Sequence, residues 1–203
     1  MTVTSAIGRA ANKLIRLIVN GLAISKIHPN ILTLTGLLIN IGAAVLLGFG
    51  KFFWAGIVII CAGLFDMVDG RVARQTNQVT KFGGFFDSVL DRYSDLGLLM
   101  GLLVYYASIN RNFYVVLTAV VMTASVMISY TRSRAENAIS TCKVGFMERP
   151  ERILLLFLGT AITFLMPMIL WILAVGTNLT VVQRVLYTRR RMVHEEGIGK
   201  GNG

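Results

Sequence analysis

The chain has 203 residues, of which 55% are hydrophobic and only 15% charged, and a mean hydropathy of +0.67 excludes an ordinary soluble domain. A formal net charge of +10 is typical of nucleic-acid-binding proteins. Here, however, the basic residues adjoin apolar stretches, where anionic lipid headgroups and membrane topology explain them better. We therefore predict an integral membrane protein with membrane lipids around it and no nucleic-acid partner.

The N-terminal segment, residues 1–28, is predicted to form an amphipathic helix in the cytoplasmic interface of the membrane. Apolar residues recur there at helical spacing, with basic residues on the opposite face: Ile7, Leu14, Ile18 and Leu22 against Arg9, Lys13 and Arg16. Pro29 then ends this helix and turns the chain into the bilayer. A polar leader without structure is the alternative.

Six apolar stretches follow, and each is read as a helix that crosses about 30 Å of hydrocarbon. They are Ile31–Gly50, Phe52–Arg74, Gly83–Tyr106, Phe113–Tyr130, Arg152–Leu165 and Met168–Tyr187. The predicted fold class is thus an all-α integral membrane protein of six transmembrane helices. Residues 29–191 form its single membrane domain, and the polar, glycine-rich residues 192–203 are expected to be a disordered tail.

The basic residues predict how these helices are oriented. Lys51 and Arg111 lie at one end of the predicted spans, whereas most of the other lysines and arginines lie at the opposite end. The positive-inside rule assigns the basic end to the cytoplasm. We therefore expect a multi-pass cell membrane protein with both termini in the cytoplasm.

Acidic residues are concentrated in one part of the apolar chain. All five aspartates lie within thirty positions, at the expected cytoplasmic ends of the second and third spans: Asp66, Asp69, Asp87, Asp91 and Asp95. The first two are three residues apart and the others are spaced by four, so each set lines one helix face. Because Gln75–Phe82 is a short linker, the two spans are expected to form an antiparallel hairpin in which these faces meet.

Facing carboxylates in a membrane predict a bound cation. A charged side chain near the bilayer centre costs roughly 2.5 to 3.5 kcal/mol on insertion scales, so a cluster of carboxylates needs compensation. Ligands that are all oxygen favour hard divalent ions such as Mg²⁺ or Mn²⁺. The sequence therefore predicts a metal site, with small residues such as Gly70 and Gly83 leaving room for a phosphate-bearing ligand.

The acidic segments also follow a known pattern. From Asp66 to Arg74, and after eight further residues from Gly83 to Asp91, the chain reads DxxDGxxAR and GxxxDxxxD. Eight specified positions at fixed spacing make this a specific signal. The chain resembles the CDP-alcohol phosphotransferases, membrane enzymes that displace CMP from a CDP-linked lipid with the hydroxyl of a second alcohol.

This resemblance implies roles for individual residues. One or two Mg²⁺ or Mn²⁺ ions would bind the pyrophosphate of CDP-diacylglycerol, and Asp91 would be the catalytic base that takes the proton of the attacking hydroxyl. The implied metal ligands are Asp66, Asp69, Asp87 and Asp91, and the implied CDP-lipid residues are Asn30, Thr33, Asp69, Gly70, Ala73, Arg74 and Gly83. The family commonly forms homodimers; Gly97 and Gly101 fit either a dimer interface or packing within one chain.

Five arginines lie at the depth of the aspartates, at the ends of the last three spans: Arg132, Arg134, Arg149, Arg152 and Arg184. Arginine binds phosphate in a bidentate fork, so they predict a pocket for the phosphate of the acceptor alcohol. Ordinary flanking charge with snorkelling side chains is the alternative.

The acceptor is suggested by a narrower resemblance. Ile128–Glu136, Gly145–Arg152 and Asp91–Asp95 are similar to segments of the phosphatidylinositol phosphate synthase branch, although Arg132 stands where that branch has lysine. The resemblance implies inositol 1-phosphate as acceptor. Phosphatidylglycerophosphate synthase is the alternative within the family, and Arg92 argues against it because that branch has lysine there.

A cation or proton-coupled transporter is the alternative from another class, because carboxylates within a membrane also line ion pathways. Two features favour the enzyme. The acidic residues gather at one face of the membrane, and the sequence shows no pair of inverted repeats.

Overall fold

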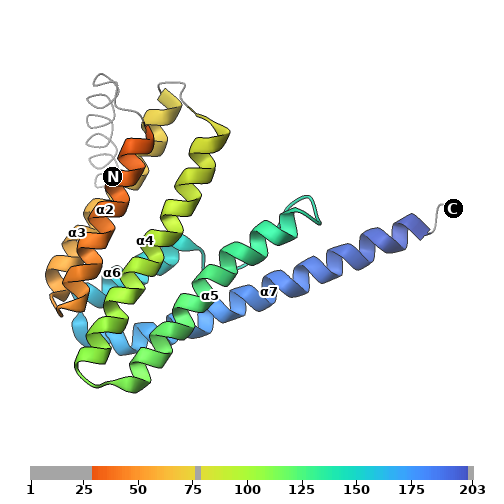
Figure 1. Cartoon of the computed structure of the whole chain (residues 1–203). Helices are drawn as coiled ribbons and strands as arrows, with labels where there is room; N and C mark the ends of the chain where they lie inside the picture. The colour runs from red at the N-terminus through yellow and green to blue at the C-terminus, as the bar shows by residue number, and fades with distance from the viewer. Residues whose placement is uncertain (1–28, 76–78, 201–203) are drawn as a thin grey trace, which may run out of the picture.

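The structure, a computed structural model, describes the backbone of residues 29–75 and 79–200 and the side chains of residues 30–63, 65–66 and 79–193. The described elements are all helical: α2 Pro29–Gly48, α3 Phe52–Gln75, α4 Lys81–Ser108, α5 Asn112–Glu136, α6 Arg149–Ala161, the 3₁₀ helix η1 Thr163–Leu165 and α7 Met166–Lys200 (Figure 1). The all-α fold class is confirmed for this part of the chain. The amphipathic helix predicted over residues 1–28 lies outside the described residues.

Three of the described segments are long and apolar enough to cross a membrane. They are Asn30–Gly48, Asn112–Glu136 and Thr163–Val193, and Phe52–Gly63 is a shorter apolar segment. The helix α6 has only 13 residues, about 20 Å of helix, which is less than the hydrocarbon thickness. The chain is thus a helical membrane protein, and the count of six spans stays a prediction.

The helix α2 lies between α3 and α4 and packs against both (Figure 1). Over the described residues α3 and α4 have little direct contact, so the two spans of the expected hairpin are not packed directly against each other. The backbones of α2 and α4 approach closely at Gly101, where an added Cβ would lie 2.1 Å from the carbonyl oxygen of Ala44. Gly101 is thus used for packing within one chain.

One end of the bundle is filled by apolar side chains, and we call it the packed end. The helices α4, α5 and α7 converge there beside the turn that joins α4 to α5 (Figure 1). Its fully buried residues include Leu98, Leu102, Val121, Leu170 and Leu173. Close packing of these side chains stabilises the contact between the helices.

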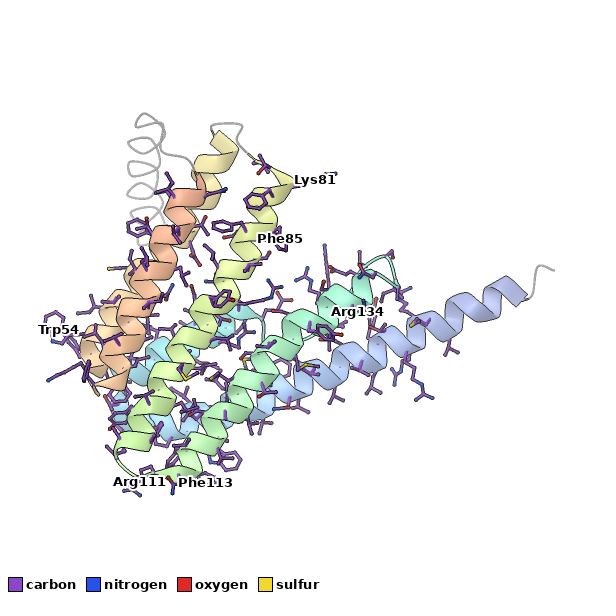
Figure 2. All side chains as sticks on the ribbon, viewed as in Figure 1. Trp54, Lys81, Phe85, Arg111, Phe113 and Arg134 are labelled. Carbon is purple, nitrogen blue, oxygen red and sulfur yellow. The ribbon has the colours of Figure 1, made fainter. Side chains whose placement is uncertain are left out.

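The other end carries the polar side chains. Figure 2 places Lys81 and Arg111 at opposite ends of α4. Thr80 caps the start of α4, since the backbone N–H of Gly83 donates to its Oγ1 at 2.9 Å. At this end α4 and α5 diverge from one another (Figure 1).

The last helix differs from its prediction. α7 continues to Lys200 and projects past the end of α5 (Figure 1), whereas a disordered tail was predicted over residues 192–203. Arginine, methionine and glutamate in residues 189–196 are good helix formers, so the helix continues through a segment that is polar overall.

The start of α6 is marked by a proline. Pro150 stands in the first turn of this helix, a position that favours helix initiation.

Candidate active site

A polar cavity of about 560 Å³ opens where α4 and α5 diverge, and the first turn of α6 and the side of α7 complete it. Asp91 and Asp95 line it from α4, with four of the five predicted arginines: Arg132, Arg149, Arg152 and Arg184. Arg134 is exposed at the end of α5 away from the α4 turn (Figure 2), and is not among the lining residues. The structure thus gathers most of the predicted arginines beside two of the aspartates.

Arg149, the first residue of α6, joins the acidic faces of two other helices. Its Nη1 lies 2.5 Å from Asp66 Oδ2 on α3 and 2.9 Å from Asp91 Oδ1 on α4. Its Nε also donates to Asp95 Oδ1 at 3.4 Å. Carboxylates from α3 and α4 therefore converge on a single cationic atom, even though α2 keeps the two helices apart.

Asp95 and Arg152 form a buried ion pair behind this cluster. Their exposed fractions are 6% and 5%, and Arg152 Nη2 contacts Asp95 Oδ2 directly. Arg152 Nη1 donates in addition to the carbonyl oxygen of Met147 at 3.3 Å. Because both charges have lost their water, each depends on the other for compensation.

Arg184, which is 2% exposed, connects three parts of the chain. It donates from Nε to Val144 O at 2.9 Å, from Nη1 to Ile128 O at 2.5 Å and from Nη2 to Glu148 Oε1 at 3.1 Å. Arg132 lies nearer the surface, with Glu136 at 3.0 Å and Glu148 at 3.8 Å. Glu148 therefore ties two of the cavity arginines together.

The predicted CDP-lipid residues lie where α2 and α4 begin. An added Cβ at Gly83 would lie 3.5 Å from Asn30 Oδ1, so these two positions adjoin. Thr33 is buried one turn further along α2. The remaining members, Asp69, Gly70, Ala73 and Arg74, belong to the last turns of α3, and their side chains are outside the described set.

The donor set can be tested for a divalent cation. Among the described side chains no group of three acidic, histidine or cysteine residues is close enough to form a metal cluster, and Asp69 is not among them. Asp66 and Asp91 nevertheless already converge on one cation, the guanidinium of Arg149. Hard oxygen donors from two helices that surround a positive charge fit Mg²⁺ or Mn²⁺.

A second hollow, of about 440 Å³, adjoins the acidic cluster on its other side, and we call it the apolar groove. Ile59 and Ile60 line it from α3, and Ile153, Leu154 and Phe157 from α6, while Asp66 and Arg149 border both the groove and the cluster. A polar and an apolar hollow thus meet at Arg149.

Sequence reasoning missed two features of this site. It did not identify Glu148 as the partner of Arg132 and Arg184, although this residue directly precedes Arg149. It also did not expect Arg149 to contact aspartates, because Arg149 and Asp66 are 83 positions apart. No helical periodicity relates residues at such a distance.

Comparison with known proteins identifies relatives of the chain. Residues 26–183 match the family model described as CDP-alcohol phosphatidyltransferase. A phosphatidylinositol phosphate synthase from Streptomyces avermitilis is 34% identical over 178 residues, which cover 81% of this chain and 73% of the relative. An archaetidylinositol phosphate synthase from Pyrococcus horikoshii is 36% identical over 172 residues, covering 84% and 88%.

Solved structures agree with these relatives. The phosphatidylinositol phosphate synthase of Mycobacterium tuberculosis with CDP-DAG bound superposes with a TM-score of 0.80 at 30% identity, over 87% of this chain and 94% of that one. The same enzyme in complex with manganese and citrate gives a TM-score of 0.78 at 33% identity, covering 84% and 86%.

Proposed function

The chain belongs to the CDP-alcohol phosphatidyltransferase family, and we propose that it transfers the phosphatidyl group of CDP-diacylglycerol to inositol 1-phosphate. The products are phosphatidylinositol phosphate and CMP. One observation carries the proposal: an arginine-lined polar cavity and an apolar groove meet at a cluster of carboxylates. That arrangement suits a reaction that joins a lipid to a small anion.

The apolar groove supports a lipid donor. Its isoleucine, leucine and phenylalanine side chains match acyl chains in polarity, and Asp66 borders its polar end. The starts of α2 and α4 adjoin at Asn30 and Gly83, where the absent Cβ of glycine leaves the backbone accessible. We assign the cytidine and phosphates to these residues together with Thr33, Asp69, Gly70, Ala73 and Arg74.

The acidic cluster supports metal-assisted phosphoryl transfer. Asp66, Asp69, Asp87 and Asp91 would hold one or two Mg²⁺ or Mn²⁺ ions, which would supply charge neutralisation on the pyrophosphate. The structure of the tuberculosis relative in complex with manganese supports a divalent metal in this family. Asp91 also lines the polar cavity, so its carboxylate is within reach of an acceptor hydroxyl and can take its proton.

The arginines support a phosphorylated acceptor. Arg152 is held in place by Asp95, and Arg184 by Glu148 and two carbonyl groups. Guanidinium groups fixed in this way lose little entropy when they bind a phosphate. Arg132, which is partly exposed, lines the same cavity. Inositol phosphate synthases among the relatives support inositol 1-phosphate as the alcohol.

The membrane setting follows from the same proposal. The basic end of the bundle, with the site, faces the cytoplasm by the positive-inside rule. We also propose a homodimer. Gly101 packs against Ala44 inside the chain, whereas an added Cβ at Gly97 would meet nothing within 4 Å among the described atoms, which leaves that position for a partner helix.

The proposal is tested by release of CMP from CDP-diacylglycerol in detergent or liposomes. We expect turnover with Mg²⁺ or Mn²⁺ and none after chelation with EDTA. Inositol 1-phosphate, glycerol 3-phosphate, serine and free inositol are compared as acceptors, and inositol 1-phosphate should give the highest kcat/KM. Metal-independent turnover would contradict the assigned metal site, and cation flux without CMP release would favour a transporter.

A further inference from the structure

Arg149 stands at the point where the metal-binding and anion-binding parts of the site meet. It is the first residue of α6 and lines both the polar cavity and the apolar groove. Its side chain is 27% exposed, so it is held by its contacts but is not enclosed. Among the cavity arginines, it alone is paired with two of the motif aspartates over the described residues.

The contacts of Arg149 use two of the proposed metal ligands. Its Nη1 is 2.5 Å from Asp66 Oδ2 and 2.9 Å from Asp91 Oδ1. The same two carboxylates would hold a divalent ion, so the ion and the guanidinium depend on the same oxygen atoms. A guanidinium and a cation of twice its charge also repel one another at close range.

We infer that Arg149 is a built-in competitor of the divalent cation, and that metal binding transfers its guanidinium from Asp66 and Asp91 to the phosphate of the acceptor. The inference rests on the proposed function. It deepens that function by making metal binding and acceptor binding interdependent.

The direction of the transfer follows from the remaining contacts. Asp95 Oδ1 accepts from Nε of Arg149 at 3.4 Å and stands at the wall of the polar cavity. A guanidinium that leaves Asp66 and Asp91 but keeps Asp95 turns toward Arg132 and Arg152, which line the same cavity. Its freed Nη groups then have donors available for a phosphate, which binds guanidinium in a bidentate fork.

Coupling of this kind is reciprocal. If Mn²⁺ raises the affinity for inositol 1-phosphate because it frees Arg149, inositol 1-phosphate must raise the affinity for Mn²⁺ by the same factor. Removal of Arg149 should therefore have two opposite effects. The aspartates gain affinity for metal because their competitor is lost, and the coupling disappears.

The test is isothermal titration of the purified protein in detergent with Mn²⁺, with and without inositol 1-phosphate. Arg149→Met should bind Mn²⁺ about fivefold or more tightly than the unsubstituted protein, with no further gain from inositol 1-phosphate. Arg132→Met is the matched control, because it removes one positive charge from the same cavity but contacts only Glu136 and Glu148 in the structure. Equal Mn²⁺ affinities of the two variants would overturn the inference.

A second measurement needs no substitution. Phenylglyoxal modifies accessible arginines, and mass spectrometry of the digested protein reports each site. Mn²⁺ should increase modification of Arg149, whereas Arg134, exposed outside the cavity, should not respond. Unchanged modification of Arg149 would overturn the inference even if Arg149→Met does not fold.

These outcomes are distinguishable from failure of the proposed function. Unsubstituted protein that binds Mn²⁺ and releases CMP, but shows no response of Arg149, overturns the inference alone. Unsubstituted protein that neither binds Mn²⁺ nor releases CMP overturns the proposed function and the inference with it.

Discussion

The two ends of the bundle hold their helices together by different means. At the packed end, α4, α5 and α7 meet through fully buried aliphatic side chains such as Leu102, Leu170 and Leu173. At the charged end, α3, α4 and α6 meet through Arg149, Arg152 and three aspartates. One end is stabilised by close packing of apolar side chains, and the other by compensation of charge.

This difference separates stability from chemistry. Apolar contacts at the packed end can be lost in small steps, because each removed methyl group costs a limited amount. Removing the partner of a buried charge instead costs a large amount of free energy in one step, because the remaining charge stays desolvated without compensation. Substitutions at the two ends should therefore differ in what they damage as well as in size.

The largest effect is expected for Asp91→Asn. This nearly isosteric change removes a proposed metal ligand and the proposed base together, so CMP release should fall by about 10³-fold to 10⁴-fold. The assay is turnover of CDP-diacylglycerol at saturating acceptor and metal. Turnover retained in Asp91→Asn would remove the proposed base.

Breaking the buried pair should destabilise the charged end most. Asp95→Asn leaves Arg152 buried without its partner, which costs about 3–5 kcal/mol in the free energy of unfolding. Thermal unfolding in detergent measures the loss. The double variant Asp95→Leu with Arg152→Leu removes both charges and should recover most of the stability but none of the activity; a double variant as unstable as the single one would contradict this account.

At the packed end, Leu170→Ala should lower stability without altering the chemistry. Leu170 is 0% exposed, and such a truncation costs about 2–5 kcal/mol. The unfolding temperature should fall while kcat, measured well below it, stays unchanged. Leu179→Ala is the matched control on the same helix, because Leu179 is 49% exposed and leaves no cavity; equal effects of the two would mean that burial is not what stabilises α7.

A smaller effect is expected for Arg132→Ala, which tests the cavity and leaves the fold unchanged. Loss of one charge-assisted hydrogen bond to the acceptor phosphate should raise its KM about tenfold at nearly constant kcat. Arg134→Ala, outside the cavity lining, should raise KM less. A KM that responds to neither variant would favour the interpretation of these arginines as flanking charge.

The smallest effect is expected for Glu136→Gln. Its ion pair with Arg132 is 3.0 Å long and both side chains are well exposed, so its loss should cost less than about 1 kcal/mol in unfolding free energy. Comparison of the unfolding temperatures of Glu136→Gln and Asp95→Asn measures what an exposed and a buried ion pair each contribute to stability. A large shift for Glu136→Gln would show that Arg132 is constrained more strongly than its exposure indicates.

Local pattern predicted much of this structure. The start of α3 at Phe52 and that of α5 at Asn112 lie at or beside the predicted residues, because an apolar run that follows a polar turn has only one plausible beginning. The aspartates of α4 share one face, as helical spacing predicted. Asp66 and Asp91 do come together, but they do so on the guanidinium of Arg149, which the pattern did not predict.

The sequence pattern did not predict the tertiary contacts between helices. α2 is apolar on all sides, so nothing in its sequence indicates that it packs between α3 and α4. The position of Arg149 among the aspartates depends on how α6 is placed against α3, which short-range periodicity does not encode. Residues 192–200 were misjudged because their polarity was weighed more heavily than their helix propensity.

The placement of α2 has a further consequence. This helix contains no charged residue. Because it lies between α3 and α4, however, its width sets the distance between the two helices that carry the aspartates. Gly36 faces Asp66, with an added Cβ 3.4 Å from that carboxylate, and Ala44 abuts Gly101 on α4. Bulkier side chains along α2 should therefore move α3 and α4 apart and change which headgroups fit the proposed site, without replacing any of its proposed residues.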